Sequence, residues 1–137
     1  MVKMSKKILV GMAWMALLWG CGNASNDEIA DNALDGGRYF LENCKQGDFK
    51  KANFYLVDNP ENQSYLKDIS TAYFKLDKEG RQEFRQASIQ INEVQALDSN
   101  HTIISYQSSF DKIPHQIKVI HSPTGWKVDL KYTYTGK

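Results

Sequence analysis

The feature that most constrains the fold is a change in the spacing of apolar residues after Gln86. From Ile89 onward apolar and polar side chains alternate, most regularly over residues 126–134. Neighbouring residues of a strand point to opposite faces of a sheet, so this alternation predicts strands with one buried and one solvated face. The inward set of the last segment is Trp126, Val128, Leu130, Tyr132 and Tyr134. We therefore expect an antiparallel sheet that is covered on one side.

Turn signals divide this region into four strands. Residues 98–100 and 122–125 are rich in turn formers, and residues 111–114 interrupt the alternation between them. The parity of the apolar residues changes near Asn92-Glu93, which indicates a β-bulge in the first strand.

The part of the chain before Gln86 has apolar residues at steps of three and four, which predicts helices. The residues expected to begin or end these helices are Gly47, Asp48, Asp58-Asn59-Pro60, Ser64 and Asp77. Helices followed by consecutive strands indicate an α+β fold. We expect the N-terminal helices to pack on the concave face of a curved four-stranded antiparallel sheet.

Residues 1–20 have the pattern of a secretory signal peptide. Three lysines precede an uncharged, mostly apolar stretch over residues 8–19. This stretch is shorter than the roughly 20 residues that a membrane-spanning helix needs. We therefore expect it to direct export and then to be removed.

Leu18-Trp19-Gly20-Cys21 resembles the lipobox of bacterial lipoproteins, apart from the bulky Trp19. The resemblance implies that the Cys21 thiol takes a diacylglyceryl group and that the freed amine takes a further acyl chain such as palmitate. We expect a protein anchored through Cys21 to the bacterial outer membrane and facing the periplasm. The alternative is an ordinary thiol beside a general signal-cleavage site.

Charge argues against a nucleic-acid partner for the mature chain. Loss of three lysines with residues 1–20 lowers the basic count from 17 to 14 against 16 acidic residues, a net charge of −2. Polar residues 22–31 indicate a flexible stretch, so we expect a lipidated tether over residues 21–32 and one domain over residues 33–137.

Two segments resemble nuclear transport factor 2-like (cystatin-like) domains. Residues 39–52 are similar to their opening helix pair, and Gly125-Trp126-Lys127-Val128 is similar to their final strand. The resemblance is closest to small secreted bacterial lipoproteins of this superfamily. It implies a roll whose cone binds a ligand or serves as a scaffold. A few members of the superfamily, of ketosteroid isomerase-like or dehydratase-like type, are enzymes that use a cavity Asp, His or Tyr, so the resemblance also allows catalysis.

Four side chains with inward parity are candidates to line such a cone. They are Tyr106, His121, Tyr132 and Tyr134. Phenols and an imidazole in an apolar setting suit an apolar ligand with one polar end. The alternative is that they are core aromatics with their polar atoms at the rim.

Catalysis needs a carboxylate beside these groups, and the acids considered for that role are Asp58, Asp68 and Asp129, none with clear inward parity. The favoured function is therefore a non-catalytic module of the cell envelope that binds a small ligand or another envelope protein. A cavity enzyme is the alternative.

No metal site or other cofactor is expected. His115 and His121 lie six residues apart on one strand, which separates them by about 20 Å, and His101 begins a different strand. Cys44 lies on the apolar face of a helix and is expected to be a small buried side chain rather than a nucleophile.

Overall fold

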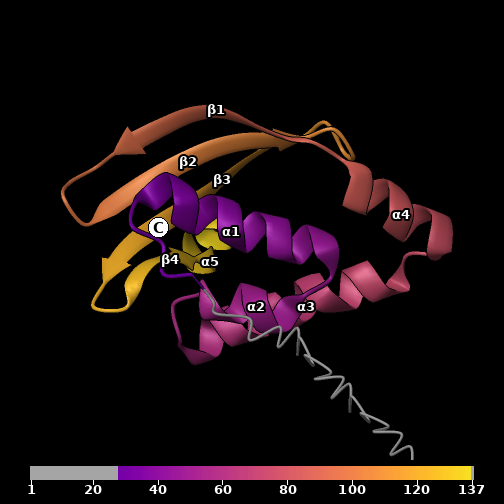
Figure 1. The fold of residues 1–137 in the computed structure, drawn as a ribbon, viewed down its shortest axis with the longest axis horizontal. Helices are drawn as coiled ribbons and strands as arrows, with labels where there is room; N and C mark the ends of the chain where they lie inside the picture. The colour runs from indigo at the N-terminus through magenta and orange to yellow at the C-terminus, as the bar shows by residue number, and fades with distance from the viewer. Residues whose placement is uncertain (1–27, 137) are drawn as a thin grey trace, which may run out of the picture.

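Four helices precede a four-stranded sheet and one short helix follows it, so the predicted α+β order is confirmed (Figure 1). The computed structural model describes residues 28–136. The predicted signal peptide and Cys21 lie outside the described residues. The elements are α1 (Ala33–Gln46), α2 (Phe49–Phe54), α3 (Pro60–Lys75), α4 (Lys78–Gln86), β1 (Ile89–Ala96), β2 (His101–Ser108), β3 (Pro114–Ser122), β4 (Gly125–Asp129) and α5 (Leu130–Thr135).

The strands form an antiparallel meander in the order β1-β2-β3-β4. The register of β1 against β2 shifts between Ile91 and Glu93, which confirms the predicted bulge. The predicted turns also lie between the strands, and the last one ends at Gly125 with φ of 103°, a value that glycine adopts without strain.

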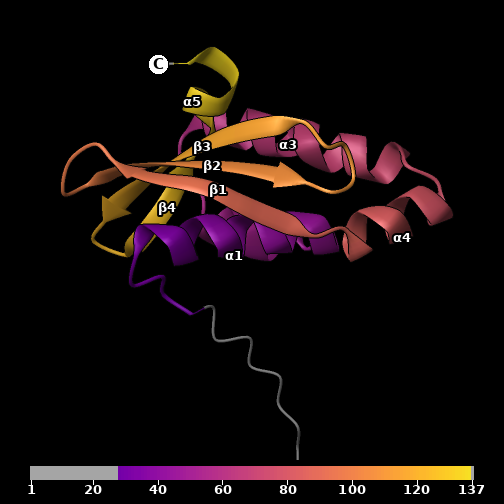
Figure 2. The same cartoon turned by 90° about the horizontal axis from the view of Figure 1, so that it is seen from above.

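Helix α1 lies along the inner face of the sheet, and the strands arch over it (Figures 1 and 2). A Cβ atom on Gly36 would stand 2.7 Å from the carbonyl oxygen of Trp126, and one on Gly37 would stand 2.7 Å from Ile104 Cδ1. The missing side chains thus let α1 approach β4 and β2 closely. The largest fully buried side chains of the resulting core are Phe40, Leu56, Ile104, Ile117, Leu130, Val119, Val128 and Asn62.

Four of the five predicted helix boundaries are confirmed, including the break at Asp58-Asn59-Pro60 between α2 and α3, and one is wrong. Gly47 ends α1 in the left-handed conformation, and the side chains of Asp48 and Asp77 cap α2 and α4. Helix α3 does not begin at Ser64. Its cap is Asn59, whose side chain accepts from the Asn62 N–H. Pro60 is tolerated at the first helical position because it lacks only an N–H that would be unpaired there anyway.

The predicted last strand is too long. Strand β4 ends at Asp129, and the chain then forms α5, so Leu130, Tyr132 and Tyr134 do not continue the alternation of Trp126 and Val128. The N–H of Leu130 donates to Oδ1 of the buried Asn62 on α3 at 3.0 Å. The N–H groups of Trp126 and Val128 donate to Ala30 and Tyr55 on the edge of β4 away from β3, and the Leu130 N–H meets Asn62 on this same side.

Residues 28–32, which we expected to belong to the tether, lie against the domain. The Ala30 side chain is 3% exposed, and its carbonyl oxygen accepts from the N–H of Trp126 at 3.2 Å. The Tyr55 hydroxyl donates to the carbonyl oxygen of Glu28 at 2.7 Å. These contacts tie Glu28 and Ala30 to the domain ahead of the predicted boundary at residue 33.

Candidate functional site

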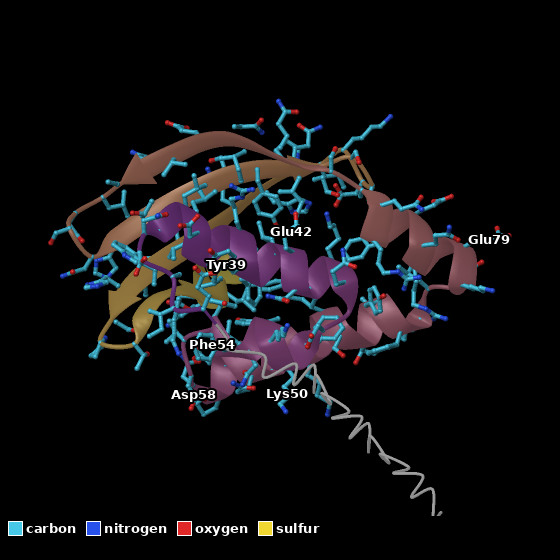
Figure 3. All side chains as sticks on the ribbon, in the orientation of Figure 1. Tyr39, Glu42, Lys50, Phe54, Asp58 and Glu79 are labelled. Atoms are coloured by element: carbon cyan, nitrogen blue, oxygen red, sulfur yellow. The ribbon has the colours of Figure 1, made fainter. Side chains whose placement is uncertain are left out.

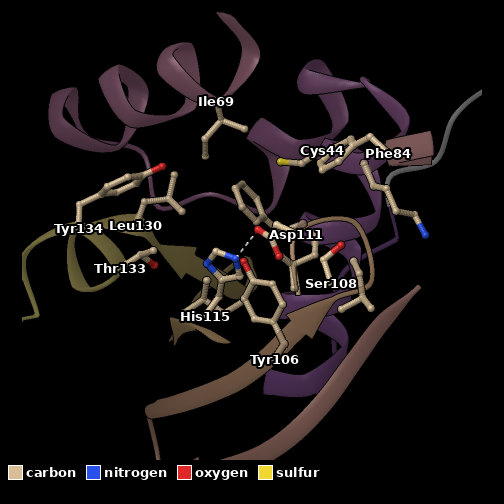
Figure 4. Close-up of a pocket in the computed structure, with 15 residues that line it drawn as sticks. Cys44, Ile69, Phe84, Tyr106, Ser108, Asp111, His115, Leu130, Thr133 and Tyr134 are labelled. Carbon is tan, nitrogen blue, oxygen red and sulfur yellow. Dashed lines mark hydrogen bonds and ion pairs between the residues drawn. The ribbon is translucent and has the colours of Figure 1, made fainter. Parts of the chain in front are cut away.

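A cavity of about 400 Å³ lies between the inner face of the sheet and the helices (Figure 4). Its apolar wall is contributed by α1, α3, α4, β1, β3 and α5. The side chains of this wall are Phe40, Leu41, Ile69, Phe84, Ile89, Ile117 and Leu130. A cavity of this size and composition is typical of a site for a small organic ligand.

Polar groups of the lining gather around Tyr106, Asp111 and His115 (Figure 4). Tyr106 of β2 and His115 of β3 are direct cross-strand neighbours, and their rings stack with centroids 5.3 Å apart. Asp111 comes from the loop between the same two strands, and its Oδ2 lies 2.8 Å from His115 Nε2. The hairpin itself therefore brings a phenol, an imidazole and a carboxylate together.

Local hydrogen bonds hold Asp111 in its ionised form. Desolvation raises the pKa of this carboxyl, but the hydrogen bonds from the Ile113 N–H and from His115 outweigh it, and the pKa lies below its ordinary value. Because Asp111 is ionised, its Oδ2 accepts in this hydrogen bond and His115 Nε2–H donates.

The Tyr106 hydroxyl is free to meet a ligand. Within residues 28–136 it has no hydrogen-bond partner, and its oxygen is not sealed off from solvent. Burial raises the pKa of Tyr106, with the neighbouring Cys44, Tyr134 and Asp111 acting in the same direction. The phenol therefore stays protonated and offers its O–H as a donor.

Only two of the four candidate ligand residues line this cavity. They are Tyr106 and Tyr134, and Tyr134 also stacks on Tyr65 with centroids 4.5 Å apart. Tyr132 lies instead on an adjoining hollow of about 500 Å³, which Tyr106 and His115 also line, and its hydroxyl is 3.5 Å from Gln116 Oε1. In a helix, residues two apart point in different directions, so α5 separates the two tyrosines.

His121 lies outside the cavity as well. It shares the inward parity of β3, but it is exposed at the far end of the strand, with its ring 5.0 Å from that of Trp126. Parity indicated its side of the sheet and not its distance along the strand from the site.

The carboxylate of the site is one that the sequence interpretation missed. Asp58 and Asp129 lie outside the cavity, and Asp68 lies on a neighbouring groove. The sequence places Asp111 in a break between strands, and its four-residue spacing from the inward-facing His115 is the signal that points to it. A tight hairpin loop returns such a residue to the side of the sheet that its partner faces.

Other reactive groups near the cavity are structural. The Cys44 thiol is buried, and burial raises its pKa to about 12, so it is protonated at neutral pH. Lys45 Nζ is held at 2.9 Å by Glu42 and at 2.9 Å by the carbonyl oxygen of Ala87. Among residues 28–136 no group of three or more His, Cys, Asp or Glu side chains could hold a metal ion.

Within the same residues no helix is long and apolar enough to cross a membrane. Comparison of the chain with protein-family models, with curated proteins and with solved structures found no match.

Proposed function

We propose that this protein is a lipid-anchored module of the bacterial cell envelope that binds a small apolar molecule with one polar end. The observation that carries the proposal is the free Tyr106 hydroxyl at the polar end of an otherwise apolar cavity. A ligand there buries its apolar body against α1 and the sheet and accepts a hydrogen bond from Tyr106. Anchoring through Cys21 keeps the cavity beside a membrane, which is a store of such molecules.

Filling the cavity tests this proposal. Ile69 is half-buried in α3 and lines the cavity, so Ile69→Trp is expected to occupy the ligand's space and abolish binding. The measurement is calorimetric titration of 1-octanol into the full acylated chain in lipid nanodiscs, with protein-free nanodiscs subtracted. Val94→Trp is the matched control, because Val94 is 47% exposed on β1 and does not line the cavity. Unchanged binding by Ile69→Trp contradicts the proposal.

A second pair of variants tests the polar end. Removing the hydroxyl in Tyr106→Phe is expected to weaken octanol binding about fivefold, the usual worth of one hydrogen bond between neutral groups. Tyr39→Phe is the control, because Tyr39 points from α1 toward α2 and packs on Tyr55 at 5.2 Å rather than on the cavity (Figure 3). Equal affinities for the two variants contradict a role for Tyr106.

A cavity enzyme is the second candidate, and the Asp111–His115 pair favours it. The carboxylate orients the imidazole through Nε2, so that Nδ1 can act as a general base, and the Tyr106 hydroxyl can polarise a carbonyl. This arrangement suits removal of a proton from the carbon beside a carbonyl group. We rank it second because both side chains of the pair are about one-third exposed, at 31% and 33%.

Hydrogen–deuterium exchange of a simple ketone tests the enzymatic candidate. Proton NMR of 2-octanone in D₂O follows the loss of the protons beside its carbonyl group. Catalysed exchange that disappears in His115→Ala supports the enzyme. The same rate with both proteins, or with buffer alone, contradicts it.

We also propose that the domain is a member of the nuclear transport factor 2-like superfamily. The order of elements supports it, with helices first and then a curved antiparallel meander that arches over α1. The two motif-like segments over residues 39–52 and 125–128 lie where the resemblance requires, in the α1–α2 pair and in β4.

A further inference from the structure

The charge around the polar end of the cavity is unbalanced. Asp111 supplies a full negative charge, since the hydrogen bonds that it accepts lower its pKa. The other titratable side chains of the lining are Cys44, Lys45, Tyr106, His115 and Tyr134. Burial raises the pKa of Cys44, Tyr106 and Tyr134, so these three groups stay neutral.

The single lysine of the lining does not offset this charge. Lys45 Nζ is already engaged by the Glu42 carboxylate and by the carbonyl oxygen of Ala87, each at 2.9 Å. Its side chain is 12% exposed and is held at the junction of α1 with the end of α4. An anionic ligand group beside Tyr106 therefore meets the Asp111 carboxylate, and the lysine of the lining is not free to compensate it.

The hydrogen-bonding groups at this end suit an uncharged oxygen. The Tyr106 hydroxyl donates to a carbonyl or hydroxyl oxygen, and the second ring nitrogen of His115 pairs with a hydroxyl. Asp111 accepts from the Ile113 N–H through Oδ1 at 3.0 Å and from His115 through Oδ2 at 2.8 Å. An ammonium group would have to lose its hydration to enter the cavity, a cost that opposes its attraction to Asp111.

We propose that the cavity selects ligands whose polar end is an uncharged hydroxyl or carbonyl group, and that Asp111 is the residue that excludes carboxylates. This inference rests on the proposed ligand-binding function and names the chemical class of the ligand. Among membrane-derived molecules it favours alcohols, ketones and aldehydes over free fatty acids.

Three probes of equal chain length test the selection. They are 1-octanol, octanoate and octylammonium, titrated at pH 7.5 into the full acylated chain in nanodiscs by calorimetry. Protein-free nanodiscs measure the partition of each probe into the bilayer, and affinities refer to the free probe. We expect octanol to bind about tenfold more tightly than octanoate, since the charge repulsion acts across a partly solvated site.

Two isosteric variants assign the effect to Asp111. In Asp111→Asn the octanol-to-octanoate ratio is expected to fall to about threefold or less, because the repelling charge is gone. Asp98→Asn is the matched control. Asp98 forms the same kind of pair with His101 at 2.8 Å, but in the β1–β2 turn and not in the cavity lining. The octanol-to-octanoate affinity ratio of Asp98→Asn is expected to equal that of the wild type.

The outcomes separate the two proposals. Equal binding of octanol and octanoate, an unchanged ratio in Asp111→Asn, or tighter binding of octylammonium than of octanol overturns the selectivity and leaves ligand binding intact. Failure of all three probes to bind overturns the proposed function, and the selectivity with it.

Discussion

At the scale of single residues, the buried Asn62 connects three parts of the fold. Its side chain is fully buried, with Nδ2 donating to the Val57 carbonyl at 3.0 Å and Oδ1 accepting from the Leu130 N–H at 3.0 Å. One amide thus satisfies backbone groups of the α2–α3 loop and of α5. An apolar side chain of similar size leaves both groups without this partner, and the Leu130 N–H is then buried and unpaired.

Asn62→Leu is therefore expected to lower the free energy of unfolding by about 3 kcal/mol. Urea denaturation followed by circular dichroism gives this value. Gln63→Leu is the control, because Gln63 hydrogen-bonds to Asn53 at an exposed position. If the free energy of unfolding falls by the same small amount in both variants, Asn62 does not hold α5 in place.

Asp111 also gives the domain a pH-dependent stability. Its pKa is lower in the folded protein than the value near 3.9 of an unfolded chain. The folded state therefore gains stability from this group above that value, and the gain disappears as the pH falls through the folded pKa.

The stability difference between the wild type and Asp111→Asn is expected to be larger at about pH 6 than at about pH 3. Urea denaturation across this range measures it. The difference between the two proteins is the informative quantity, because hydrogen bonds from Asn100 and His101 lower the pKa of Asp98 as well. A difference that grows as the pH falls contradicts the assignment.

At the scale of elements, the packing of α1 depends on two adjacent glycines that meet different neighbours. A Cβ at Gly36 meets the backbone carbonyl of Trp126, which β4 holds in place, at 2.7 Å. A Cβ at Gly37 meets the terminal methyl group of Ile104 at the same 2.7 Å, and a side chain can turn away where a backbone cannot.

Gly36→Ala is accordingly expected to destabilise the domain by about 2–3 kcal/mol, and Gly37→Ala by less. Thermal unfolding of both variants shows which of them loses more stability. Helix propensity alone favours alanine equally at both sites, by about 1 kcal/mol. A more stable Gly36→Ala therefore contradicts the close contact between α1 and β4.

The two edge strands of the sheet are protected from pairing with another chain in different ways. Tyr55 and Val57 hydrogen-bond to Val128, at 2.7 and 2.9 Å, and so cover the outer edge of β4. Strand β1 forms the other edge, and its bulge and the exposed Glu93 hinder pairing with another chain.

At the scale of the whole molecule, the proposed anchor and the cavity act together. The proposed acylation at Cys21 would concentrate the domain at a membrane. Residues 28–32 pack on β4, so only residues 22–27 separate the proposed anchor from the domain. Two or more acyl chains are needed for a lasting attachment.

Cys21→Ser is expected to remove lipid labelling and to release the protein from the outer-membrane fraction. Metabolic labelling with a palmitate analogue and membrane fractionation measure both effects. Cys44→Ser is the matched control, because its thiol is buried and protonated. Retained label in Cys21→Ser contradicts the lipobox interpretation.

Local sequence signals determined most of the order of elements in this protein. Gly47, Asp48 and Asp77 mark helix ends through their own backbone and side-chain chemistry, and the bulge near Asn92-Glu93 follows from side-chain parity. Each of these features depends on neighbours a few residues away, so the sequence alone contains the necessary information.

Tertiary structure decided the features that depend on distant partners. Residues 130–135 alternate as a strand does, but they form α5, and Asn62, 68 positions away, pairs with the Leu130 N–H that the first turn of a helix leaves without a partner. The same turn of the chain removes Tyr132 from the cavity. Asp111 enters the site only because the hairpin folds it back onto His115. Alternation reports which face a side chain prefers, whereas only the folded chain determines which groups compete for a backbone hydrogen bond and which side chains meet.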